Sequence, residues 1–140
     1  MKIKQKEDAL DPECRPIAAV LFMSGAVRLE CDFHRLCEVI AETQAICPLG
    51  KLDFKKKSGG LYSEVIYTTL LQMHNAGLLE WDDAGGLLTV KRNGLVFDDF
   101  VHELNRIPGF ESPDIREKFR RAGIWIARNI HNDATPVRRI

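Results

Sequence analysis

The chain has 140 residues, of which 45% are hydrophobic and 29% charged, a composition typical of one globular domain with a buried core. Lysine plus arginine equal aspartate plus glutamate at 20 each, so a role in DNA binding would need local clusters of positive charge. The longest apolar run, Ile17 to Met23, is too short to span a membrane and no signal-peptide pattern is present, so we expect a cytoplasmic protein without a membrane partner.

The N-terminal half begins with a predicted flexible tail at residues 1–10 and a first predicted helix at residues 12–24. Asp11 followed by Pro12 is typical of a helix start, because the carboxylate caps free N–H groups and proline fits the first turn. The segment Ile17–Met23 is apolar nearly all round. This pattern predicts that the helix lies buried at the centre of the domain.

A second predicted helix spans residues 33–45, with Asp32 as its cap. Its apolar residues recur at helical spacing and its charged residues fall on the other side. The residues that follow, Lys51 to Lys57, are rich in lysine. We expect them to form an irregular basic link exposed to solvent.

The third predicted helix, residues 64–76, has the clearest boundaries. Ser63 is suited to cap its start, and Gly77 stands where a left-handed residue ends a helix. Residues 78–81 and 86–89 then flank a loop of turn-forming residues, which predicts a β-hairpin.

The C-terminal part predicts two further helices, residues 90–105 with Thr89 as cap and residues of about 113–130. Residues 132–140 are expected to be a flexible tail, which leaves residues 11–131 as the single domain. The wing unit within it would span about residues 58–105.

The order of helix, glycine stop and hairpin resembles the winged-helix superfamily, in which L-x-x-L-x-x-x-G-L precedes a hairpin and L-T-x-x-G. The matching residues here are Leu70, Met73, Gly77, Leu78, Leu88, Thr89 and, two positions late, Gly94. Residues 17–100 also loosely resemble the YwgA-like group and the Panacea-type antitoxin domain, through Tyr62 and Ser63. The resemblance implies a mainly α (α+β) winged helix-turn-helix domain with a helical N-terminal half, a small hairpin wing and an added C-terminal helix.

A winged helix of this kind most often binds DNA, so the first functional hypothesis is a transcription-regulator-like protein whose helix 64–76 enters the major groove of duplex DNA. Polar side chains on its outer face would contact bases, and nearby cations would contact phosphates. The candidate residues are Lys55, Lys56, Lys57, Ser63, Thr68, Gln72, Asn75, Lys91 and Arg92.

Several features favour a different role. The helix 64–76 carries no lysine or arginine, Glu64 stands at its start, and Asp82 and Asp83 lie in the wing loop, where they would repel phosphate. The alternative is a dimeric protein-interaction or scaffold module. Ile124 and Trp125 lie off the apolar stripe of the last helix and would form a homodimer interface, unless both are core residues.

No catalytic or metal-binding pattern is visible, so we expect no enzyme activity, no metal and no cofactor. The serines and histidines have no nucleophile or acid–base context, and Asp98, Asp99 and Glu103 are expected on a solvent-facing helix stripe. Cys31, His34 and Cys37 are evenly spaced, but structural zinc usually takes four ligands from close cysteine pairs. Cys14, Cys31, Cys37 and Cys47 therefore read as reduced thiols.

Overall fold

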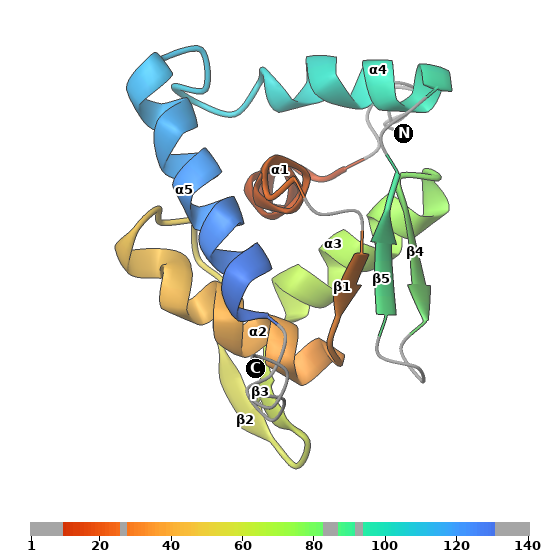
Figure 1. Ribbon diagram of the computed structural model, residues 1–140, viewed down its shortest axis with the longest axis vertical. Coiled ribbons are helices and arrows are strands. Elements are labelled where there is room, and N and C mark those ends of the chain that lie inside the picture. The colour runs from red at the N-terminus through yellow and green to blue at the C-terminus, as the bar shows by residue number, and fades with distance from the viewer. Residues whose placement is uncertain (1–9, 26–27, 83–86, 92–93, 131–140) are drawn as a thin grey trace, which may run out of the picture.

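The computed structural model describes residues 10–25, 28–82, 87–91 and 94–130 (Figure 1). The helices in this part of the chain are α1 (Arg15–Met23), α2 (Phe33–Glu42), α3 (Glu64–Asn75), α4 (Gly94–Leu104) and α5 (Pro113–Asn129), with short 3-10 turns at Pro12–Cys14 and Thr43–Ala45. The strands are β1 (Arg28–Glu30), β2 (Lys55–Lys57), β3 (Gly60–Tyr62), β4 (Leu79–Asp82) and β5 (Leu87–Val90). The structure is thus a helix-rich α+β fold.

Helix α1 lies at the centre of the molecule, seen end-on in Figure 1 with the other helices around it. Its residues from Ile17 to Phe22 are buried, because the segment is apolar on every side and packs against α3, α4 and α5. This confirms the predicted central helix. The core continues from α1 into the surrounding helices and the sheet.

The closest approach to α1 is made by α5 at Gly123. A Cβ atom built on Gly123 would lie 2.7 Å from both the Val20 carbonyl oxygen and the Ser24 amide nitrogen. These are backbone atoms of α1, which cannot rotate aside. Only a glycine therefore allows the two helices to pack at this distance.

We expect Gly123→Ala to destabilise the fold by about 1–3 kcal/mol, because the two backbones must separate. The sign of this change in stability separates close packing from helix propensity, since propensity alone would make the same substitution stabilising by about 1 kcal/mol. Urea unfolding of both proteins, followed by circular dichroism, measures the difference. A raised unfolding midpoint would contradict the close packing of α1 and α5.

The larger sheet has the order β1-β5-β4 with antiparallel neighbours. The β4–β5 hairpin is the one that the sequence predicts, and its register pairs Trp81 with Leu88. Strand β1 joins the other side of β5, where Leu29 pairs with Leu88 and both side chains are buried. The sheet thus covers one side of the core next to α3.

Helix α3 ends as the sequence predicts. Gly77 has a φ of 81°, its N–H donates to the His74 carbonyl, and the Leu78 N–H donates to the Met73 carbonyl at 2.8 Å. This pair of hydrogen bonds is the Schellman arrangement, and the buried Leu78 and Met73 supply its apolar contact. The chain then turns directly into β4.

Three predictions of local structure are wrong. The expected basic link instead contains β2, which pairs with β3 in a two-stranded antiparallel ribbon turned at Ser58 and Gly59. Thr89 does not cap a helix, because it lies in β5 between Arg28 and Glu80 of the neighbouring strands. Helix α4 accordingly begins at Gly94.

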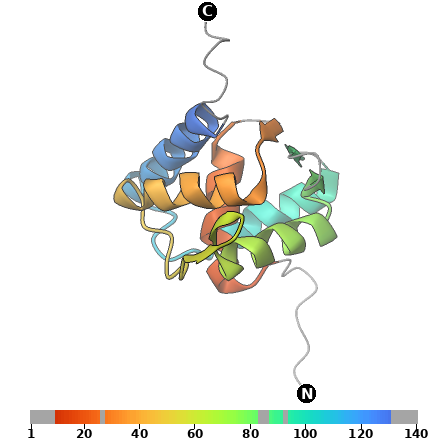
Figure 2. The ribbon, with the colours of Figure 1, turned by 90° about the horizontal axis from the view of Figure 1, so that it is seen from below.

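In Figure 2 the molecule is seen from the side on which the β2–β3 ribbon lies. The ribbon runs beside α2 and in front of α3. The ribbon packs on α2 through β3. Its turn needs glycine, since a Cβ on Gly59 would meet the ring of His34 and Gly60 has a φ of 131°. Glycine at positions 59 and 60 therefore allows the ribbon to pack closely on α2.

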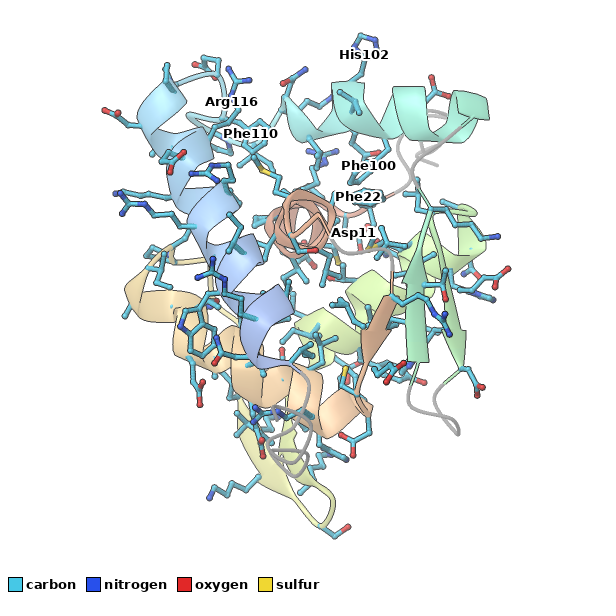
Figure 3. All side chains as sticks on the ribbon, in the orientation of Figure 1. Asp11, Phe22, Phe100, His102, Phe110 and Arg116 are labelled. Atoms are coloured by element: carbon cyan, nitrogen blue, oxygen red, sulfur yellow. The ribbon has the colours of Figure 1, made fainter. Side chains whose placement is uncertain are left out.

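Helix α4 lies beside α1, and the Phe22 and Phe100 rings are in contact between the two helices at a centroid distance of 4.4 Å (Figure 3). His102 points away from the body in the same view. The predicted solvent-facing stripe is wrong for Glu103, which is only 1% exposed. The apolar Val101 of α4 is 42% exposed.

Glu103 is buried because the N-terminal segment covers it. Its Oε2 accepts hydrogen bonds from the Leu10 amide at 2.8 Å and from Arg15 Nε at 3.2 Å. Leu10 is buried as well, so the predicted flexible tail is wrong at this residue. The rest of that tail, residues 1–9, and the predicted tail at 132–140 lie outside the described residues.

Candidate functional site

The outward face of α3 carries the residues that the sequence predicts for base contact. Thr68 is half-buried, Asn75 is exposed, and Leu71 between them is 39% exposed. These three residues follow helical spacing and share one face. His74 is also exposed near the end of the helix.

Two predicted contact residues of α3 have other roles. The Ser63 side chain is buried, where its hydroxyl accepts from the Ile66 N–H and donates to the Leu52 carbonyl at 2.7 Å. Burial removes Ser63 from any contact with DNA, although its predicted role as a helix cap is confirmed.

Gln72 is held by the segment that precedes α1. Its Oε1 accepts from the Asp11 N–H at 2.8 Å, and its Nε2 donates to Asp11 Oδ2 at 3.0 Å. Both ends of the amide are therefore engaged within the protein. A contact between Gln72 and a base would require breaking both hydrogen bonds to Asp11. Gln72 is therefore not a base-contacting residue in this structure.

The lysine strand, Lys55 to Lys57, is the main positively charged feature beside α3. All three side chains are exposed, and β3 connects the strand directly to the start of α3. The Lys57 ammonium lies 4.6 Å from the centre of the Tyr62 ring, a cation–π contact within the ribbon. The ribbon thus carries exposed positive charge beside the N-terminus of the helix.

The phosphate contacts predicted after the hairpin are less well supported than those of the lysine strand. Lys91 Nζ forms an ion pair with Glu80 Oε2 at 2.8 Å, and this pair lowers the pKa of the Glu80 carboxyl. Arg92 lies outside the described residues, as does Asp83 of the wing loop. Asp82 is exposed at the end of β4.

The proposed interface residues on α5 are both half-buried. Trp125 packs against the core cluster from its rim. In the apolar stripe beside them, Phe119, Ala122, Ile126 and Ile130 are buried, whereas Ile115 is half-buried. Part of both side chains therefore remains open to solvent.

A feature that sequence reasoning missed is a cluster of aromatic rings from four separate elements. Phe33 of α2 contacts Tyr62 of β3 at 5.5 Å, Tyr67 of α3 at 5.6 Å and Trp81 of β4 at 5.9 Å between ring centroids. Tyr67 also contacts Trp81 at 5.6 Å. We call these four residues the aromatic cluster. They are far apart in the sequence, so no local periodicity reveals them.

The aromatic cluster lines an open pocket of about 340 Å³ together with Asp32 and His34. Phe33 is buried, whereas the other three rings are half-buried and border the opening. His34 Nδ1 lies 2.8 Å from the Leu61 carbonyl and must donate to it, since a carbonyl only accepts. This bond fixes the ring orientation at the pocket wall.

The Tyr62 hydroxyl is also fixed, because it donates to Glu64 Oε1 at 2.6 Å. This hydrogen bond to a carboxylate raises the pKa of the Tyr62 phenol to about 12. The phenol therefore keeps its proton to a higher pH than an ordinary tyrosine. Glu64 is held against the ribbon at the first turn of α3.

The cysteines are free thiols. Cys14, Cys37 and Cys47 are buried, and desolvation raises the pKa of each thiol, that of Cys37 to about 12. A buried thiol with a raised pKa is a poor nucleophile at neutral pH. Among the described residues, no group of three or more His, Cys, Asp or Glu side chains is placed to hold a metal ion.

Comparison of the chain with protein-family models, curated proteins and solved structures finds no match. In the part of the chain that the structure describes, every helix is too short or too polar to cross a membrane. The function must therefore be argued from the surface itself.

Proposed function

We propose that this chain is a winged helix that binds duplex DNA. The supporting topology is the succession α1, β1, α2, α3, β4 and β5, together with the sheet order β1-β5-β4. In a winged helix the helix before the hairpin is the reading helix, which is α3 here. The β2–β3 ribbon is an addition between α2 and α3.

The observation that carries the proposal is the lysine strand beside α3. Its three consecutive lysines are exposed, and the β3 strand that pairs with them runs into the first turn of α3. A helix laid in the major groove has phosphates on both sides, so cations flanking its N-terminus would contact one strand. The ribbon would supply these cations in place of the wing.

The exposed face of α3 would supply the base contacts. Asn75 can pair with an adenine edge, Thr68 with several bases, and Leu71 offers an apolar surface to a thymine methyl group. A bidentate pair such as Asn75 with adenine typically contributes about 1–3 kcal/mol of discrimination between bases. The proposal thus assigns phosphate binding to the ribbon and sequence preference to the helix.

We expect duplex DNA binding to be measurable at low salt and to weaken steeply as salt rises. Reversing the charge of Lys55, Lys56 and Lys57 to glutamate should reduce the slope of log K against log salt by about 2.7, because each phosphate contact contributes about 0.9. Fluorescence anisotropy with a labelled duplex of mixed sequence, at graded salt, measures both the affinity and the slope.

A matched control reverses Lys118, Arg121 and Arg128, which are exposed on α5 and change the net charge equally. The control should retain most of the affinity and the slope. Equal losses in both variants would assign binding to net charge and not to the ribbon. No binding by the wild-type protein at low salt would reject the DNA proposal.

The second candidate is a dimeric interaction module, favoured by the half-buried Ile124 and Trp125 on α5. We expect Ile124→Glu to convert a wild-type dimer to a monomer, because a charge in a paired apolar surface is costly. Trp125→Ala should act in the same direction. Sedimentation equilibrium decides, and a wild-type monomer at micromolar concentration would leave this surface without an assigned role.

A further inference from the structure

The pocket at the aromatic cluster is not needed for the DNA proposal and has a chemistry of its own. We propose that it binds an organic cation of the alkylated ammonium class, such as a trimethylammonium group. The faces of aromatic rings carry negative charge density, and several rings around a cation replace its weak hydration shell. The inference does not rest on DNA binding.

The geometry fits a small ligand. The volume of about 340 Å³ lies at the lower end of the range for small-molecule sites. Phe33 forms the buried base of the cluster, and the half-buried Tyr62, Tyr67 and Trp81 border the opening. The wall groups are held in place, because the ring contacts join α2, β3, α3 and β4.

The charge of the pocket favours a cation. Asp32 lines the opening with an exposed carboxylate, one oxygen of which accepts from the Arg35 N–H at 2.8 Å as the cap of α2. Among the described lining residues, Asp32 is the one carboxylate, and no lysine or arginine lines the pocket. An anionic ligand would meet this carboxylate directly.

The protein itself shows that these rings attract positive charge. The Lys57 ammonium lies 4.6 Å from the centre of the Tyr62 ring although the lysine is exposed and free to extend into solvent. A trimethylammonium group has no hydrogen-bond donor and would bind to the remaining ring surface. The base of a nucleotide would also stack on aromatic rings, but the phosphate of the nucleotide would be repelled by the Asp32 carboxylate, so we favour the cation.

The test uses choline and its neutral isostere 3,3-dimethylbutan-1-ol, which has the same shape without the charge. A Trp125→Phe background leaves Trp81 as the single tryptophan, so its fluorescence reports on the pocket. We expect choline to change the emission in a saturable manner and the isostere to bind at least about threefold more weakly. Equal responses to both compounds, or no response to choline, would overturn the proposal.

Two variants localise the site. Asp32→Asn keeps a good helix cap but removes the charge, and Tyr67→Leu removes one ring. Each should weaken choline binding at least about threefold, whereas Tyr62→Phe keeps the ring and should bind as before. Far-ultraviolet circular dichroism confirms that each variant is folded. Unchanged affinity in folded Asp32→Asn and Tyr67→Leu would overturn the assignment.

Adenosine and adenosine monophosphate, titrated in the same way, test the competing ligand class. We expect both to bind more weakly than choline. Tighter binding of either one would overturn the cation proposal in favour of a nucleobase site.

Discussion

Replacing Glu103 by alanine is expected to lower the free energy of unfolding by about 3–5 kcal/mol, since the change removes one partner of the buried ion pair with Arg15. Arg15 is buried at the start of α1, and its Nε lies 3.2 Å from Glu103 Oε2. The Leu10 N–H donates to the same oxygen at 2.8 Å and would lose this acceptor. A loss of this size is a large fraction of the stability of an ordinary domain.

Urea unfolding followed by circular dichroism measures the effect, and Asp99→Ala is the matched control. Asp99 is also acidic and lies on α4, but its side chain is exposed. The control should change the free energy of unfolding by no more than about 0.5 kcal/mol. Comparable losses in the two variants would mean that charge on α4, and not burial at Glu103, sets the stability.

The double variant Arg15→Met with Glu103→Leu separates the two causes of the loss. Replacing a whole buried ion pair by apolar residues of similar volume is often neutral or stabilising. We therefore expect the double variant to recover most of the stability that Glu103→Ala loses. A double variant as unstable as the single one would indicate that the Leu10 hydrogen bond is the dominant contribution.

Local signals in the sequence predicted the helices and the main hairpin, because each depends on residues close in the chain. The Asp32 carboxylate accepts from the Arg35 N–H, Ser63 caps α3, and Gly77 ends it in a left-handed conformation. Caps and stops of this kind need no tertiary context. The apolar segment of α1 was equally informative about burial.

The short strands were missed because strands of three residues have no usable periodicity. Strand β1 has a single buried residue, Leu29, and pairs with a strand far along the chain. Strand β2 is a run of lysines, which resembles a solvated link. The Ser58-Gly59 turn was the one available signal, because two turn residues between pairing segments are typical of a hairpin.

The candidate site was only partly predictable for the same reason. Gln72 and Glu103 looked solvent-facing by helical spacing, but the segment before α1 covers both through Asp11 and Leu10. The aromatic cluster brings together residues from Phe33 to Trp81, and only the fold places them in contact. Tertiary contacts therefore decide which polar residues are free to bind and where a pocket forms.

Phe33 is the centre of that arrangement, so Phe33→Ala should be strongly destabilising. The ring is 7% exposed and contacts three other aromatic rings. Truncating a buried phenylalanine typically costs about 3–5 kcal/mol, because a cavity remains and the dispersion contacts are lost. Urea unfolding should show a lower midpoint with an unchanged slope, the sign of lost stability without a change in the unfolded state.

Phe33→Leu is the informative partner of this variant, since it keeps apolar volume but removes the aromatic contacts. We expect it to lose less than half as much free energy as Phe33→Ala, with each lost ring pair contributing about 0.5–1.5 kcal/mol. In the Trp125→Phe background, Phe33→Leu should also shift the emission of Trp81, because their rings are in contact. Equal losses for both variants would mean that Phe33 acts through volume alone.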